Sequence, residues 1–346
     1  MNSDSVFLDR LLRSAGLKIV IPGLLLSAAP ANARDAELPI LTDQSQAPFD
    51  LANMDAERTE AQQILALQDP LSVAPDAEAR LPEQSISEDA RQRVSYGRQL
   101  GSIKWEIGGA LLWLTASNIY KANNAGVRGF HFQHEGWFGD DTFNLGIDKL
   151  AHAWNSYWIT DAAAARIRYK SGASNPELPA FTVSMGLMIY SELWDAHKKN
   201  GGFATNDVIM NTAGAAFSVL RNRVPGLKEK LDFRQFVMPN SDVYTPTGVK
   251  HFRQLRYLMA LKLSGFEGMD RSPLRFVELH AGYRATGFSR PERARGEPLR
   301  QRPFVGIGIN LNQLFFRNPK GWAGKAASTA LQYIQVPYTA YHVEVR

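Results

Sequence analysis

Cysteine is absent from all 346 residues of the sequence. Its absence excludes disulfide bonds, thiolate metal ligands, a cysteine nucleophile and a lipid-modified N-terminal cysteine. Charged residues are sparse at 21%, whereas 45% of the residues are hydrophobic and 10% are aromatic. This composition is sufficient to bury a core, and it excludes a collagen-like, low-complexity or wholly disordered chain.

Long hydrophobic runs are missing as well. The apolar run at residues 19–29 is about half as long as a bilayer span, which needs about 20 residues. Three basic residues precede this run, and the small-residue pattern Ala31-Asn32-Ala33 follows it. The arrangement is typical of a secretory signal peptide, with an uncleaved interfacial anchor as the alternative. We therefore predict a signal peptide over residues 1–33 and a location in the periplasm or at the outer-membrane periphery of a Gram-negative bacterium.

The net charge of +5 is unevenly distributed. Residues 34–100 hold 13 acidic and 6 basic residues, so the rest of the chain carries the basic excess. Residues 34–95 are also rich in Pro, Ala, Gln and Ser without sustained apolar periodicity, which predicts an acidic disordered linker. The basic body behind it either keeps the protein soluble or faces anionic lipid. No nucleic-acid recognition motif accompanies the charge, so we expect no nucleic-acid partner.

Residues 96–238 show helical patterning. Uncharged or nearly uncharged stretches cover residues 105–119, 178–191 and 208–220, and strong helix formers fill residues 147–170. The uncharged stretches are about 13–15 residues long, which favours buried core helices over membrane-spanning ones. We predict a helical bundle here, with a bundle half embedded in a membrane surface as the alternative.

Beyond residue 239 the apolar period changes to two. A helix is expected over 322–334. Alternating apolar positions predict four antiparallel strands, near residues 255–263, 277–285, 305–311 and 341–345. The predicted fold is therefore α+β: a helical bundle core followed, over residues 239–346, by a small antiparallel β-sheet of about four strands.

A basic segment, residues 290–302, lies in the second predicted hairpin. It holds five arginines diluted by two glutamates. Such a loop is either simply solvated or binds the phosphates of anionic lipid headgroups. We predict a membrane surface or anionic lipid as the partner of this loop, and an envelope protein is a further candidate partner.

Polar side chains interrupt three of the predicted helices. Asp148 and His152 are four residues apart and therefore share a helix face, as do Asp207 and Asn211. Charged groups inside a helical bundle destabilise it unless they are paired. The candidate catalytic residues are Asp148, Lys149, His152, Glu192, Asp195, Asp207 and Asn211.

Three interpretations of these residues are open. The groups form a satisfied structural network, with Lys149 paired to a carboxylate. Alternatively, they perform acid–base catalysis, with His152 oriented by a carboxylate and Lys149 or Asn211 stabilising an anion. In the third interpretation they bind a divalent metal, for which the candidate ligands are Asp148, His152, Glu192 and Asp195.

A histidine-containing string precedes these helices. His131, His134 and Glu135 form an HxxHE pattern among aromatic residues and glycines. The pattern differs from the HExxH motif of zinc-binding helices, and its surroundings are typical of a loop. We interpret these histidines as ordinary surface residues, with metal binding as the alternative.

The spaced polar set resembles a known family. The resemblance to domain-of-unknown-function family 2279, a group of predicted periplasmic or outer-membrane proteins, covers about residues 130–316. It implies an envelope location and implies no reaction. The family includes a lipoprotein, whereas this sequence has no cysteine to carry a lipid. The Asp-Lys-x-x-His start is also similar to VanZ-like membrane proteins. The motif positions are Asp148-Lys149-x-x-His152, Ser156-Tyr157, Glu192-x-x-Asp195, Gly202-Phe203 and Asp207-x-x-x-Asn211-x-x-Gly214.

Two functional hypotheses follow. The first is an uncharacterised, membrane-peripheral periplasmic protein of the cell envelope that acts as a structural or binding module. The alternative is a metal- or His/carboxylate-dependent hydrolase or transferase acting on an envelope lipid or cell-wall substrate, with a divalent metal as the candidate cofactor. The sequence contains no P-loop, nucleophile elbow, dinucleotide fingerprint or zincin motif that would name a reaction.

Overall fold

The computed structural model describes residues 94–140, 142, 144–237 and 255–345. The predicted signal peptide and nearly all of the predicted linker lie outside these residues. None of the helices in the described part combines the length and the apolarity that crossing a bilayer requires.

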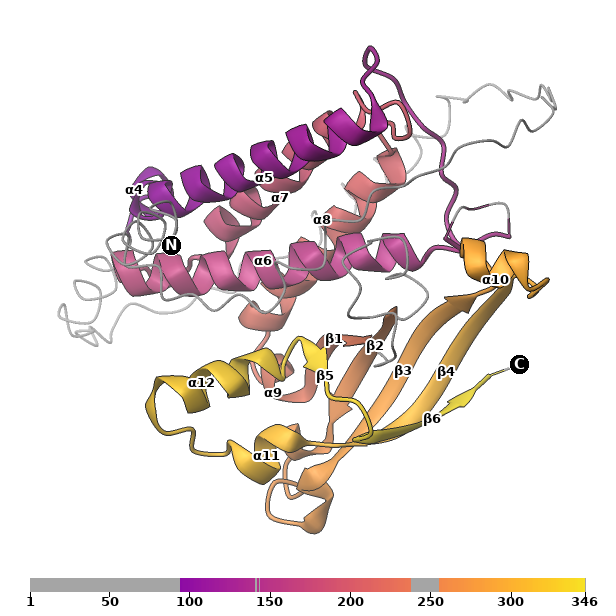
Figure 1. Cartoon of the computed structure of the whole chain (residues 1–346). Helices are drawn as coiled ribbons and strands as arrows, with labels where there is room; N and C mark the ends of the chain where they lie inside the picture. Colours follow the sequence, from indigo (N-terminus) through magenta and orange to yellow (C-terminus); the bar gives the residue numbers. More distant parts are fainter. Residues whose placement is uncertain (1–93, 141, 143, 238–254, 346) are drawn as a thin grey trace, which may run out of the picture. The chain divides into compact units, whose positions relative to one another are not determined.

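Four long helices form one layer of the fold (Figure 1). Helices α6, α7 and α8 pack against one another, and α5 lies against α7. These four helices coincide with the four stretches that the sequence predicted to be helical. The bounds are α4 (Tyr96–Ser102), α5 (Lys104–Ala125), α6 (Ile147–Ser171), α7 (Glu177–Asp195), α8 (Thr205–Arg223) and the single turn α9 (Leu227–Lys230).

The second layer is a mixed sheet, and the α+β prediction is confirmed. Its strand order is β5-β1-β2-β3-β4-β6, and every pairing is antiparallel except that of β1 with β5. The sheet has six strands rather than the predicted four. The bounds are β1 (Leu231–Val237), β2 (Leu255–Lys262), β3 (Val277–Thr286), β4 (Arg300–Ile309), β5 (Ile334–Gln335) and β6 (Ala340–Glu344).

The two missed strands have physical reasons for being missed. Strand β5 has only two residues, too few to show a period. Strand β1 lies within residues 96–238, which the sequence pattern assigned to the helical bundle, and Asp232, Arg234 and Gln235 interrupt its apolar residues so that no regular period shows. Both charged residues are nevertheless buried, at 0% and 4% exposure, so β1 is covered on both faces.

Short helical elements complete the described part. The predicted helix over 322–334 appears as α12 (Gly321–Ala330), and α11 (Leu311–Phe315) precedes it. The segment expected to be a long basic loop, 290–302, instead contains helix α10 (Arg290–Ala294) and the first residues of β4. Two 3-10 turns, η5 (Leu263–Gly265) and η6 (Pro273–Phe276), join β2 to β3.

The apolar core lies between α6 and the sheet. The buried Tyr157 ring of α6 packs 6.2 Å from the ring of Phe233 on β1. Trp154 belongs to the same cluster, and its Nε1 donates a hydrogen bond to the backbone oxygen of Tyr333 at 3.0 Å. Tyr257 on β2 extends the cluster across the sheet. Helix α6 is therefore fixed on the sheet by aromatic packing along its inner face.

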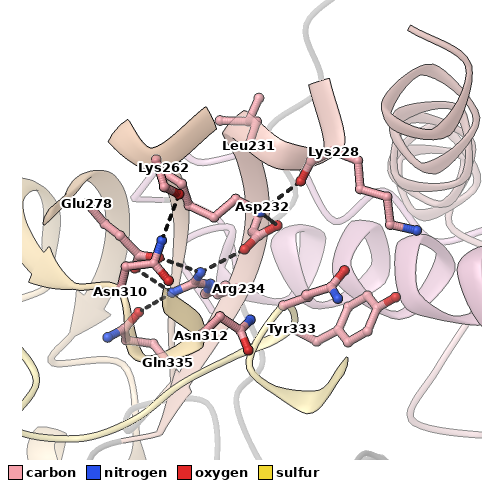
Figure 2. A network of polar contacts seen from close by, with 12 residues as sticks. Lys228, Leu231, Asp232, Arg234, Lys262, Glu278, Asn310, Asn312, Tyr333 and Gln335 are labelled. Atoms are coloured by element: carbon pink, nitrogen blue, oxygen red, sulfur yellow. Dashed lines mark hydrogen bonds and ion pairs between the residues drawn. The ribbon is translucent and has the colours of Figure 1, made fainter. Parts of the chain in front are cut away.

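The opposite face of the sheet is lined by buried charged groups. The sheet curls around this face, since the ring of Phe236 on β1 lies 5.9 Å from that of His342 on β6 although three strands separate them. Figure 2 shows Arg234 between its partners. Its guanidinium donates to Glu278 at 2.7 and 2.9 Å and to Asp232 at 2.7 Å. Burial alone would raise the pKa of Asp232, but Arg234 and the other cations around it hold that pKa below its ordinary value.

Arg221 of α8 joins this network to the helices. Its side chain is fully buried. It donates to Asp232 of β1 at 2.6 Å, to Asp161 of α6 at 3.3 Å and to the backbone oxygen of Leu231 at 2.7 Å. The guanidinium therefore connects α6, α8 and β1 through one group.

Replacing Asp232 tests how much the buried charges contribute to the stability of the fold. We expect Asp232→Asn to lower the free energy of unfolding by about 3–5 kcal/mol, because a buried ion pair that loses one partner leaves uncompensated charge. Three buried cations share this carboxylate. Urea denaturation measures the change. The control is Glu297→Gln, which removes a solvent-exposed pair with Arg295 and should change stability by less than about 1 kcal/mol. Similar losses of unfolding free energy in Asp232→Asn and Glu297→Gln would contradict a stabilising role for the buried ion pairs.

His342 gives the sheet a pH dependence with a defined sign. Burial, with help from His280 and Arg256, lowers the pKa of His342 to about 4. The unfolded chain binds this proton at an ordinary pKa of about 6.5, so the free energy of unfolding falls as the pH drops from about 6.5 to about 4. We expect His342→Gln to flatten this dependence by about 1–3 kcal/mol, measured by urea denaturation at both ends of the window. An unchanged pH dependence in the variant would contradict the prediction.

Candidate functional site

Helices α6 and α8 approach each other closely beside the polar motif. Gly214 of α8 faces the backbone of Ala153 on α6, and a Cβ at Gly214 would lie 1.9 Å from the Ala153 oxygen. Only glycine permits this approach. The close contact brings the first turns of α8 next to His152, and the end of α7 reaches the same place. Three helices therefore position the side chains described below.

Lys149 is the cation at the base of the site. It is 1% exposed, and its Nζ lies 2.5 Å from Glu135 Oε2, 2.6 Å from Asp207 Oδ1 and 3.2 Å from Asp148 Oδ2. Burial opposes the ammonium charge, but Asp148 and Asp207 outweigh it and raise the pKa of Lys149 above its ordinary value. The side chain is therefore a permanent charge.

His152 lies between two carboxylates. Its Nε2 is 3.4 Å from Asp207 Oδ2, and its Nδ1 is 3.6 Å from Glu192 Oε1 and 3.3 Å from Asn211 Oδ1. Burial would lower the pKa of His152, but Asp207 and Glu192 outweigh it and raise that pKa. The side chain is 24% exposed, so the imidazole reaches solvent while its partners are buried.

Two buried polar atoms at this site have no hydrogen-bond partner in the part of the chain that the structure describes. They are Glu192 Oε1 and Asn211 Nδ2. Ser156 Oγ donates to Asn211 Oδ1 at 3.0 Å. Burial raises the pKa of Glu192 to about 8, and the negative charge of Asp207 adds to the effect. Unsatisfied buried groups of this kind call for an explanation, such as a bound ion.

The charges at the site do not balance. Four carboxylates, one ammonium and one imidazole meet within these contacts. Ligand atoms of His152, Glu192 and Asp207 all lie within 4.8 Å of one another, and so do those of Glu135, Asp148 and Asp207. An imidazole with two carboxylates is a donor set that suits divalent transition metals, and an all-carboxylate set suits Mg²⁺, Ca²⁺ or Mn²⁺. The first group fits a divalent ion best, because Lys149 already occupies the second.

The structure brings together six of the seven residues that the sequence singled out. Asp195 is the exception: its carboxylate pairs with Lys198, which also donates to Asn118 at 2.8 Å. The four metal ligands proposed from the sequence are accordingly divided. His152 and Glu192 share a group with Asp207, whereas Asp148 lies on the Lys149 side.

Sequence reasoning did not include Glu135 among the site residues. The loop that carries it is held against the α7–α8 connection, where Gln133 N donates to Phe203 O at 3.1 Å and Phe203 N to His131 O at 2.9 Å. A Cβ at Gly202 would lie 2.3 Å from Gln133 Cβ, so this glycine permits the pairing. The HxxHE string was the available signal, and its glutamate rather than its histidines reaches the cluster.

The family resemblance is confirmed over the part of the chain that holds this site. Residues 134–223 match the family model described as Predicted periplasmic lipoprotein (DUF2279). The match covers Glu135 and helices α6, α7 and α8, and it ends before the sheet. Neither the curated proteins nor the solved structures contain a match to the chain. The family description supports a periplasmic or envelope location and names no activity.

Widening the contact between α6 and α8 should disturb the site. We expect Gly214→Ala to lower the free energy of unfolding by about 1–3 kcal/mol, because the new methyl group overlaps the Ala153 backbone. The matched control is Gly186→Ala in α7, where a Cβ meets nothing within 4 Å. The control should be neutral or stabilising by up to about 1 kcal/mol, since alanine favours helix. Thermal and urea unfolding measure the stability of both variants. Equal stability changes for Gly214→Ala and Gly186→Ala would contradict the close approach of α6 and α8.

Proposed function

We propose that this is a membrane-peripheral cell-envelope protein whose three-helix cluster binds a divalent cation on His152, Glu192 and Asp207. The observation that carries the proposal is Glu192: a carboxylate 1% exposed, with one oxygen free of hydrogen bonds in the described residues. That oxygen lies 3.6 Å from the imidazole of His152. The match to a predicted periplasmic family supports the envelope location.

A cation resolves the electrostatic problem of the site. An ionised carboxylate without a partner is strongly unfavourable in a protein interior. Lys149 compensates one of the four carboxylates, and His152 compensates a second only when it is protonated. The remaining negative charge must be met by a proton, as the raised pKa of Glu192 indicates, or by a bound metal ion. The second solution satisfies several carboxylates together.

The neighbouring groups prepare two of the three ligands. Lys149 holds Oδ1 of Asp207, which leaves Oδ2 directed toward His152 at 3.4 Å. Asn211 Oδ1 is placed to accept the Nδ1 proton of His152, and a histidine that donates from one nitrogen presents the other as a ligand. Ser156 donates to the same amide oxygen. The chain therefore orients the donor atoms of Asp207 and His152 through a second residue.

A hydrolase or transferase acting on an envelope lipid or cell-wall substrate is the second candidate. Two observations favour it: the 24% exposure of His152, which opens the site to solvent, and the pKa of Glu192 near 8, which suits proton transfer around neutral pH. A metal bound there would polarise a water molecule or a substrate oxygen. The structural network remains the alternative in which these groups serve only to join the helices.

Anionic lipid is a proposed partner of residues 290–302, and an envelope protein is a second proposed partner. Two arginines of that segment are already ion-paired, Arg295 with Glu297 and Arg302 with Glu344. This internal pairing reduces the charge that the segment offers to a membrane.

Elemental analysis of the purified chain tests metal binding. After dialysis against Zn²⁺ or Mn²⁺ and removal of excess ion, we expect about one equivalent bound to the wild type. His152→Ala and Glu192→Gln should lose it. Asp195→Asn is the matched control, since this carboxylate lies three residues from Glu192 but pairs with Lys198, and it should retain the ion.

A second readout separates the metal site from a structural network. Added ion should raise the melting temperature of the wild type and of Asp195→Asn but not that of Glu192→Gln, because only a folded, intact site binds it. If the wild type binds no ion and the site variants are merely less stable, the structural network is correct and the proposal is wrong.

A further inference from the structure

Helix α5 carries large apolar side chains on its outer face. Trp105, Leu112 and Tyr120 are 78%, 71% and 69% exposed, and Trp113 and Ile119 are 49% and 47% exposed. These positions recur with the helical period and therefore form one stripe. Figure 1 shows α5 on the side of the helical layer away from the sheet. A surface helix ordinarily presents polar residues there.

Several polar side chains of α5 face inward. Glu106 accepts hydrogen bonds from Arg166 and Lys170 of α6 at 2.6 and 2.7 Å. Thr115 shares a hydrogen bond of 2.7 Å with Tyr190 of α7, and Asn118 is 2% exposed. These polar groups share the inner face with Ile107, which packs against an apolar core cluster, so α5 carries apolar residues on both faces. Its apolar stripe is stable only where something other than water covers it.

The chain stays apolar and exposed past the end of α5. Val127, Phe130 and Phe132 are 68%, 48% and 65% exposed. The rings of Phe130 and Phe132 pack edge to face, with centroids 5.3 Å apart. A backbone bridge joins Phe132 to Phe203 and holds this segment against the α7–α8 connection. The fold therefore holds these aromatic rings at the surface.

The exposed charges at the two ends of the stripe are basic. Lys104 lies at one end of α5, and Arg128 and Lys199 lie at the other, all exposed. The two acidic residues among the described positions 94–139, Glu106 and Glu135, are both engaged by basic partners inside the fold. The surface therefore offers positive charge beside tryptophan and tyrosine.

We infer that the outer face of α5 lies in the plane of an anionic bilayer surface. Trp and Tyr rings favour the headgroup region, and basic residues beside them attract anionic lipids. The helix of 22 residues is about 33 Å long, so it presents an extended line of anchors. A second copy of the chain is a poorer occupant, because a two-fold contact through this face would set like charges against one another. The inference is independent of the metal site.

Vesicle flotation tests this placement with the full 346-residue chain. We expect binding to vesicles of phosphatidylethanolamine with phosphatidylglycerol and weak binding to phosphatidylcholine alone. A triple variant, Trp105→Gln, Leu112→Gln and Trp113→Gln, should reduce the bound fraction by about tenfold or more, because it removes the apolar anchors. Lys104→Glu with Arg128→Glu should reduce binding to the anionic vesicles specifically.

A matched control separates α5 from exposed apolar residues in general. The triple variant Trp322→Gln, Val305→Gln and Ile307→Gln changes residues that are 76%, 50% and 58% exposed on α12 and β4. It should bind vesicles like the wild type. Circular dichroism melts confirm that both triple variants fold.

Three outcomes overturn the inference. The wild type could fail to bind either kind of vesicle, or the two triple variants could lose binding equally. Sedimentation could also show that the wild type is an oligomer whereas the α5 triple variant is a monomer. The stripe would then be a contact surface for a second copy of the chain. Metal content measured on the same α5 variant should equal that of the wild type, so failure here is distinguishable from failure of the metal proposal.

Discussion

The buried guanidinium of Arg221 is the interaction on which the arrangement of the two layers depends. It pairs with Asp161 on α6 and Asp232 on β1, so helices and sheet share one charged network. The same two helices are joined again near their other ends, where Lys149 and His152 of α6 contact Asp207 of α8. The close approach at Gly214 lies between these two links. Helix α8 is thus held against α6 by charge at both of its ends and by close contact in its middle.

The two charged networks differ in their balance of carboxylates and cations. Around Arg221 and Arg234, three carboxylates meet three cations, so the charges balance, and among the described residues Arg234 Nε is left without a hydrogen-bond partner. Around His152, four carboxylates meet one ammonium and one imidazole, and Glu192 keeps an unsatisfied oxygen. A network that only holds elements together has no reason to retain excess buried charge. The charge imbalance is the observation on which the proposed cation site rests.

The sequence was sufficient for the elements with a strong period and for contacts within a helix. Helices α5 to α8 followed from apolar patterning, and the shared face of Asp148 and His152 followed from their spacing. Glu135 could not be found this way, because its place depends on a loop pairing with the distant α7–α8 connection. The position of Asp195 was also undetermined, since three-residue spacing from Glu192 did not reveal the competing partner Lys198.

In strand β1 and in helix α5, the sequence pattern did not reveal which side chains are buried. Periodicity separates two faces of an element but does not say which face is inside. In β1 the charged face is inside, because Arg221 and Lys262 supply partners for Asp232. In α5 some polar groups lie inside beside Ile107, because Arg166 and Lys170 pair with Glu106. Once its polar groups are satisfied by the fold, the helix leaves its tryptophans outward, and the medium beyond them must complete the burial.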